Sequence, residues 1–75
     1  MQVTIYYFAY LRERRGLSKE VRELTAPLTV EDLFQSILGS EMRGIRFSIN
    51  QEFVDRNQVL EDGDEVAFIP PVGGG

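Results

Sequence analysis

Three stretches of the chain alternate between apolar and polar residues, as strands do when they bury one face. They span residues 2–8, 45–50 and 65–69 and read QVTIYYF, IRFSIN and EVAFI. β-branched and aromatic residues are frequent in all three, which favours strands over helices. The apolar side of these strands is predicted to carry Val3, Ile5, Tyr7, Ile45, Phe47, Ile49, Val66 and Phe68.

Two further stretches predict shorter or weaker strands. In residues 19–24 (KEVREL) apolar and polar residues alternate imperfectly, and the stretch is bounded by Gly16 before it and Pro27 after it. This pattern predicts a half-exposed strand. Residues 53–54 follow a turn at 50–52 and form a short strand at most. A second turn, at 60–64 (LEDGD), precedes the last strand and is read as a plain turn, because the spacing of a calcium loop is missing.

Residues 29–39 (TVEDLFQSILG) carry the clearest helix signals in the chain. Thr29 and Asp32 stand near capping-box spacing, and Gly39 can end the helix. Apolar residues recur every three to four positions, which predicts one buried helix face. That face is expected to carry Val30, Leu33, Phe34, Ile37 and Leu38.

A shorter helix is predicted over residues 9–16 (AYLRERRG), ending at Gly16. We interpret its RERR charges as a solvated helix face. The predicted order is strand, short helix, strand, helix, strand, short strand, strand. This order indicates an α+β domain in which one sheet packs on one main helix.

Length and composition exclude several classes of protein. The chain has 75 residues, enough for one small core, and contains no cysteine and no histidine. Disulfides, thiolate nucleophiles, imidazole bases and the usual zinc ligands are therefore absent, and we expect no metal site. The net charge of −4 disfavours nucleic acid and anionic membranes as partners. No apolar run is long enough to cross a bilayer, and we expect a cytoplasmic protein.

The C-terminal segment IPPVGGG is the candidate for chemistry. Pro70 and Pro71 cannot donate ladder hydrogen bonds, so the sheet must stop there. We therefore divide the chain into a domain at 1–70 and a flexible glycine tail at 71–75. Glycines without a Cβ can enter a narrow channel and present the terminal carboxylate without steric shielding. Gly73, Gly74 and Gly75 form this tail.

Three blocks of sequence carry a resemblance to a known family. The ending DGDEVAFIPPVGGG, the block YFAYLRE near the start and TVEDL at the main helix resemble the small sulfur-carrier subunit of molybdopterin synthase. That family has the ubiquitin-like β-grasp fold, a mixed sheet packed on one main helix. The chain departs from the family at Gly73, where a small residue other than glycine is frequent.

The resemblance implies a protein that catalyses nothing alone. An E1-like adenylyltransferase would use ATP to adenylate the carboxylate of Gly75, and sulfur transfer would convert the adenylate to a thiocarboxylate. The tail would then enter the synthase large subunit and donate sulfur to a cyclic pyranopterin precursor. The chain itself would bind no cofactor, and the family suggests a heterotetramer of two small and two large subunits. Nucleophiles and bases would belong to the partners.

By the same resemblance, Phe8, Phe53 and Ile69 form an exposed apolar patch on the sheet face away from the helix. The alternation agrees for Phe8 and Ile69, which fall opposite the buried sides of their strands. We assign these three residues, with Pro70 and Pro71, to partner binding.

Other functions share the glycine tail. The chain could be a sulfur carrier for thiamin or cysteine synthesis, or a ubiquitin-like modifier that ends in an isopeptide bond with a lysine of its target. A β-grasp interaction module with an inert tail is a further alternative. The identity of the large partner and the chemical fate of Gly75 distinguish these alternatives.

Overall fold

A computed structural model of the protein describes residues 1–40 and 43–71. The elements that the sequence predicts are all present, with ends shifted by one residue at most. In chain order they are β1 (Gln2–Tyr7), α1 (Tyr10–Arg15), β2 (Lys19–Glu23), α2 (Val30–Leu38), β3 (Arg46–Ile49), β4 (Glu52–Val54) and β5 (Glu65–Ile69).

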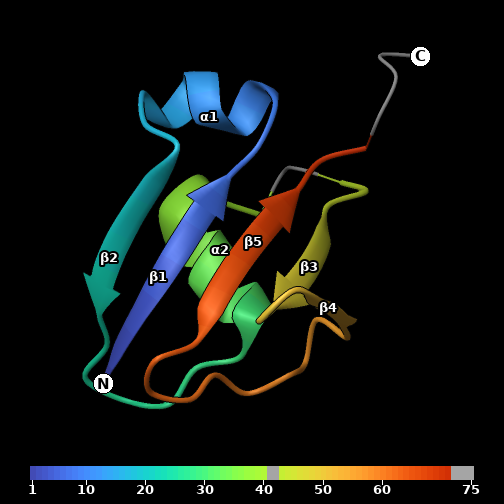
Figure 1. The fold of residues 1–75 in the computed structure, drawn as a ribbon. Coiled ribbons are helices and arrows are strands. Elements are labelled where there is room, and N and C mark those ends of the chain that lie inside the picture. Colours follow the sequence, from blue (N-terminus) through green and yellow to red (C-terminus); the bar gives the residue numbers. More distant parts are fainter. Residues whose placement is uncertain (41–42, 72–75) are drawn as a thin grey trace.

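The strands form one mixed sheet in the order β2-β1-β5-β3-β4. β1 and β5 run parallel at its centre, and every other neighbouring pair is antiparallel. Figure 1 shows α2 crossing one face of this sheet, with α1 at one end of β1 and β2. One sheet on one main helix is the predicted α+β, β-grasp architecture, and the prediction is confirmed.

The ends of α2 form as the sequence predicts. The Oγ1 of Thr29 accepts a hydrogen bond from the backbone N–H of Asp32 at 3.1 Å, which satisfies one of the free donors of the first turn. At the other end the N–H of Gly39 donates to the carbonyl of Gln35 at 2.9 Å. Gly39 has a φ of 85°, a conformation that favours glycine and ends the helix there.

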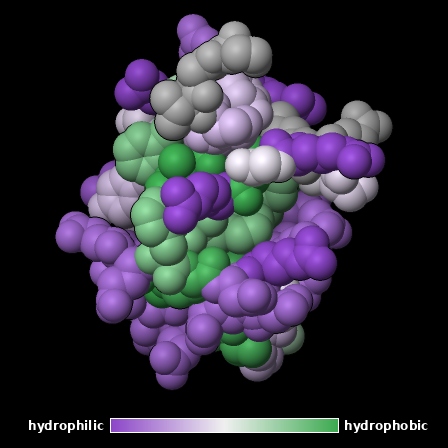
Figure 2. Space-filling view, turned by 90° about the vertical axis from the view of Figure 1, so that its right-hand side faces the viewer, coloured by the Kyte–Doolittle hydropathy of each residue, from purple (hydrophilic) through white to green (hydrophobic). Residues whose placement is uncertain are grey.

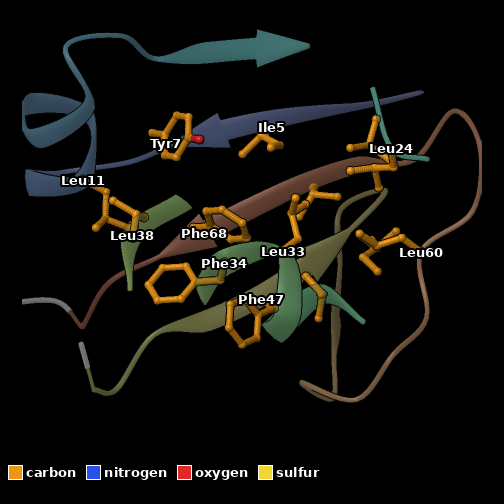
Figure 3. Packing of buried hydrophobic residues seen from close by; sticks show 14 residues of the cluster. Ile5, Tyr7, Leu11, Leu24, Leu33, Phe34, Leu38, Phe47, Leu60 and Phe68 are labelled. Carbon is orange, nitrogen blue, oxygen red and sulfur yellow. The ribbon is translucent and has the colours of Figure 1, made fainter. Parts of the chain in front are cut away.

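The core lies between α2 and the sheet, where aromatic rings meet edge to face (Figure 3). The ring of Phe34 on α2 stands at 90° to that of Phe68 on β5, with 5.0 Å between centroids. Phe47 and Tyr7 also contact Phe68 in edge geometry, which aromatic pairs prefer to a face-to-face sandwich. The central helix therefore packs on the predicted sheet face.

Burial differs from the sequence pattern at several positions. Leu11, Leu24 and Leu60 are buried, although they lie outside the strongly periodic stretches. Ile37 and Ile45, predicted as core, are only half-buried and pack at the margin of the core.

The interpretation of RERR as a solvated face is wrong for Arg15. Its Nη2 donates to Glu20 Oε2 at 2.9 Å, and its guanidinium lies 5.6 Å from the ring centre of Tyr7. The hydroxyl of Tyr7 donates to the same carboxylate, and Arg22 donates to its other oxygen. These contacts join α1, β1 and β2, and the sequence pattern alone does not show that Arg15 faces inward.

This network shifts the pKa of three of its groups. The hydrogen bond with Glu20 raises the pKa of Arg15. Burial, followed by the hydrogen bond with the Glu20 carboxylate, raises the pKa of Tyr7 to about 12. Burial alone would raise the pKa of Glu20, but the hydrogen bonds from Tyr7, Arg15 and Arg22 outweigh it and hold that pKa below its usual value. Glu20 is therefore charged at neutral pH.

Neither helix in the described residues has the length and apolar content that a membrane crossing requires.

Candidate functional site

A row of side chains crosses the sheet on the face that α2 leaves uncovered. Strand register places Tyr6 of β1 beside Ala67 of β5, Ala67 beside Ser48 of β3, and Ser48 beside Phe53 of β4. Small side chains therefore lie on β5 and β3, and aromatic rings lie on β1 and β4 to either side of them. The result is a floor between two aromatic walls.

Phe8 and Ile69 extend this floor to a pocket of about 440 Å³. Phe8 is 46% exposed and Phe53 is 58% exposed, and neither belongs to the core. Ile69 is half-buried on the same face. The structure thus brings together the three residues predicted as an apolar patch. Large apolar side chains that stay exposed on one face are typical of a binding surface.

Charged and polar groups border the pocket. The guanidinium carbon of Arg46 lies 3.8 Å from the ring centre of Phe53, a cation–π contact that holds the ring in place. At the opposite end the Nζ of Lys19 lies 5.6 Å from the ring centre of Tyr6. Gln51 and Glu65 line the remaining border. An apolar centre with a polar border is the usual anatomy of a protein–protein interface.

Figure 2 views the molecule from the side of β3 and β4. It shows hydrophobic atoms gathered in one area and framed by hydrophilic side chains. On this side of the molecule the apolar surface is therefore concentrated in one area.

The turn before β4 fixes the position of Phe53. Asn50 and Gln51 have φ values of 53° and 72°, which reverse the chain between β3 and β4. The amide of Asn50 donates to Asp64 Oδ1 at 3.2 Å and its oxygen accepts from the N–H of Glu65 at 3.0 Å. The hairpin is thereby tied to β5. Asp64 also accepts from the N–H of Glu61, as expected of a plain turn.

The chain leaves the sheet at the end of β5, next to this pocket. Pro70 is buried and Pro71 is exposed, so of the two prolines predicted for partner binding Pro71 is the exposed one. A Cβ on Gly44 would lie 3.4 Å from Pro71 Cγ, and Gly44 has a φ of 75°. A side chain at Gly44 would therefore be strained by the positive φ and would lie in contact with Pro71.

Gly73, Gly74 and Gly75 lie outside the described residues, as does most of the predicted tail at 71–75. The division of the chain at residue 70 and the role of Gly75 stay predictions. Pro71 is the last described residue, and it adjoins the pocket through Ile69 on the same strand end. The carboxylate of Gly75 is four residues further along the chain.

The described residues themselves offer little chemistry. In residues 1–40 and 43–71 no group of three or more acidic side chains is arranged to hold a metal ion. The strongest electrostatic cluster, around Glu20, is consumed by internal hydrogen bonds on β2, at the opposite edge of the sheet from Phe53. The described residues of this site therefore form a surface suited to binding.

Sequence reasoning missed the floor and the polar border of the pocket. Tyr6, Ser48 and Ala67 form the floor and one wall, Gln51 and Glu65 lie at the border, and Gly44 lies against Pro71 beside the pocket. The sequence held a signal for Tyr6, Ser48 and Ala67, because all three fall on the outward side of predicted strands. Ser48 and Ala67 are also small, whereas the inward positions of these strands carry bulky side chains. For Gly44 the sequence holds no signal, since its contact with Pro71 joins two distant segments.

Known proteins match the chain over nearly its full length. The ThiS family matches residues 5–75. The molybdopterin synthase sulfur carrier subunit of Chlamydomonas reinhardtii is 41% identical over 83 aligned residues, covering 100% of both chains. The shared length means that the similarity includes both the sheet face and the glycine tail.

Solved structures agree with the fold. SAMP1 from Haloferax volcanii superposes with a TM-score of 0.82 at 24% identity, covering 100% of both chains. Subunit 1 in a complex of subunits 1 and 2 of the molybdopterin-converting factor from Helicobacter pylori superposes with a TM-score of 0.66 at 23% identity, again over 100% of both chains. At these identities the structures bear on the fold alone.

Proposed function

The chain belongs to the ThiS family, and on that premise we propose that it is the sulfur-carrier subunit of a molybdopterin synthase. The observation that carries the proposal is the full-length match, at 41% identity, to a sulfur carrier subunit of that synthase. The thiamin-pathway carriers share the family, but the curated relatives that match over nearly the whole chain are synthase subunits. The modifier and inert-module alternatives receive no comparable support.

The proposed reaction uses the terminal carboxylate as a sulfur carrier. An E1-like adenylyltransferase transfers AMP from ATP to Gly75, releasing pyrophosphate, because a free carboxylate is a poor electrophile. A sulfur donor then attacks the acyl carbon and displaces AMP, which leaves a thiocarboxylate. In the large subunit the sulfur passes to cyclic pyranopterin monophosphate, and water restores the carboxylate. The absence of cysteine from the chain is consistent with sulfur held at the terminus.

The outer sheet face is the proposed docking surface for the large subunit. Phe8, Phe53 and Ile69 supply exposed apolar area, and Pro71 leaves the sheet beside them. A partner that covers this face receives the tail in a fixed direction, so one binding event both holds the carrier and delivers its terminus. The Helicobacter pylori complex gives a precedent for assembly of subunits 1 and 2 on this fold.

The same face and tail must also serve the activating enzyme. The tail can enter one active site at a time, so the proposed cycle alternates between the adenylyltransferase and the large subunit. We place this cycle in the cytoplasm and assign no cofactor to the chain itself.

The test is a reconstituted sulfur transfer with the thiocarboxylated protein, the large subunit and cyclic pyranopterin monophosphate. Loading should add about 16 Da to the intact mass, since sulfur replaces oxygen. Deletion of Gly75 should abolish loading and dithiolene formation while the circular dichroism spectrum stays unchanged, because the last strand ends at Ile69.

Gly73→Ala is the matched control, since it alters the tail by one methyl group and leaves the terminus in place. It should load and transfer sulfur normally. Dithiolene formation by the Gly75 deletion would contradict the proposal. Adducts on lysines of other proteins, in place of the mass increase, would identify a protein modifier instead.

A further inference from the structure

The outer edge of β2 carries backbone groups that no strand of this chain pairs. β2 is the first strand of the sheet, and β1 is its one neighbour. Met1 and Leu24 exchange both backbone hydrogen bonds across β1 and β2, at 2.9 and 2.7 Å. Antiparallel ladders alternate between bonded and non-bonded pairs. Counting back from Leu24, Arg22 and Glu20 therefore bond to β1.

The N–H and C=O groups of Lys19, Val21 and Glu23 consequently point away from β1. A second observation supports this assignment. Thr4, the partner of Val21 in the register, donates its N–H to the carbonyl of Asp64 at 3.0 Å, on the β5 side of β1. It therefore forms no bond toward β2, as a non-bonded pair requires.

The sequence of β2 is complementary in charge to its own reverse. It reads Lys-Glu-Val-Arg-Glu from residue 19 to residue 23. Placed antiparallel to a second copy and centred on Val21, Lys19 faces Glu23 of the second copy, and Glu20 faces Arg22 of the second copy. Opposite charges directly across an antiparallel pair are stabilising, and like charges are destabilising.

We propose that β2 is a homodimer edge, at which two copies of the chain pair antiparallel about a two-fold axis at Val21. In that register each residue with outward backbone groups meets another such residue. Val21 exchanges both hydrogen bonds with Val21 of the second copy, and Lys19 exchanges both with Glu23 of the second copy. The two sheets become one continuous sheet.

The pairing selects a single register. A shift by one residue would bring outward groups opposite inward ones and leave the edge unbonded. A shift of the register by two residues would leave two of the three hydrogen-bonded pairs and would place Lys19 opposite Val21 of the second copy. Alternating charges also disfavour pairing with unrelated strands, which is how exposed edges avoid aggregation. The edge thus accepts its own copy and discriminates against others.

The side chains of β2 that this pairing uses are exposed to solvent. Lys19, Val21 and Glu23 are exposed, and Val21 is 56% exposed. Within the part of the chain that the structure describes, neither Lys19 nor Glu23 takes part in an ion pair. Figure 1 shows the outer side of β2 uncovered by α1 or α2.

The dimer goes beyond the proposed function and does not rest on it. β1 lies between β2 and β5, so the edge is separated from the strand that leads to Pro71. Phe53 lies on β4, at the opposite edge of the sheet. Paired copies therefore leave Phe53 and Pro71 uncovered, and loss of sulfur transfer would leave the dimer unaffected.

Sedimentation equilibrium of the full chain from micromolar to millimolar concentration tests the proposal. The mass should rise from 8.6 kDa toward twice that value. Hydrogen exchange identifies the interface: the amides of Lys19, Val21 and Glu23 should exchange fast in dilute protein and become protected as the dimer forms. Those of Glu20 and Arg22 should be protected at both concentrations, because they bond to β1.

Charge exchange provides matched variants. Lys19→Glu places two glutamates opposite each other, and Glu23→Lys two lysines, so each should raise the dimer dissociation constant by roughly tenfold or more. The double variant with both changes restores opposite charges and should restore dimerisation. Gln2 and Tyr6, the neighbours of these positions on β1, are uncharged, so the pairing of β1 with β2 should be little affected. Lys19→Glu also removes the cation–π contact with Tyr6, which Glu23→Lys leaves in place.

A backbone variant completes the test. Val21→Pro removes an N–H that points outward, so the ladder with β1 remains while the centre of the dimer edge is lost. Val21→Thr keeps the donor and a β-branched side chain, and should dimerise normally. A monomer at every concentration, or a dimer that none of these variants weakens, would overturn the proposal.

Discussion

Both faces of the sheet carry aromatic side chains, but one face buries them and the other leaves them exposed. On the α2 face Phe68 is fully buried and contacts the rings of Phe34, Phe47 and Tyr7. On the outer face Phe53 is 58% exposed and contacts the guanidinium of Arg46. The first arrangement stabilises the fold. The second leaves apolar area available to a partner, so the comparison separates folding from docking.

The largest expected effect is on the covered face. Phe68→Ala should lower the free energy of unfolding by about 3–5 kcal/mol, because it removes a ring from the centre of the aromatic cluster and leaves a cavity. A domain this small has little stability to lose, so most of the protein should be unfolded. Urea denaturation followed by circular dichroism measures the change. A loss below about 1 kcal/mol would contradict the assigned core.

The same substitution on the uncovered face should act on binding instead. Phe53→Ala should change the free energy of unfolding by less than about 1 kcal/mol. It should weaken binding of the large subunit by about 2 kcal/mol, roughly a thirtyfold increase in Kd. Calorimetric titration of the large subunit measures the second effect. Unchanged affinity would remove Phe53 from the docking surface.

A smaller effect is expected at the Glu20 network, which lies on the α2 face at its β2 side, opposite Ile5 and Val3 of β1. Its folded-state pKa is lowered, so its contribution to stability is present above the unfolded pKa and is lost as pH falls through the lowered value. Glu20→Gln should cost about 1–2 kcal/mol at pH 7. The difference from the parent protein should vanish in acid, once the carboxylate of the parent is protonated.

Glu13→Gln is the matched control for that measurement. Glu13 lies on α1 near Arg15 but is exposed. Its replacement should leave both the free energy of unfolding and its pH dependence nearly unchanged. Urea titrations of the parent and both variants at neutral and acidic pH compare the three. An equal loss for both variants would show that overall charge, and not the network, causes the effect.

The sequence by itself determined the elements and the covered face. Alternation in 2–8 and 65–69, the three-to-four repeat of α2 and the caps at Thr29 and Gly39 are local signals, and each formed as predicted. The glycine tail and the candidate patch residues were also visible, the patch through resemblance and through strand alternation. Such features follow from residues close together along the chain, where the period of a helix or strand fixes which side chains share a face.

Only the tertiary structure decided how distant segments meet. The parallel pairing of β1 with β5 joins Tyr6 to Ala67, and the loop before β3 places Gly44 against Pro71. The inward turn of Arg15 and the free edge of β2 also depend on which strands become neighbours. The alternation of apolar and polar residues within a strand is the same whichever strands lie beside it. The order of the strands is therefore decided only when the sheet assembles. The pocket floor, the exit of the C-terminal segment and the edge complementarity therefore appear once the sheet is assembled.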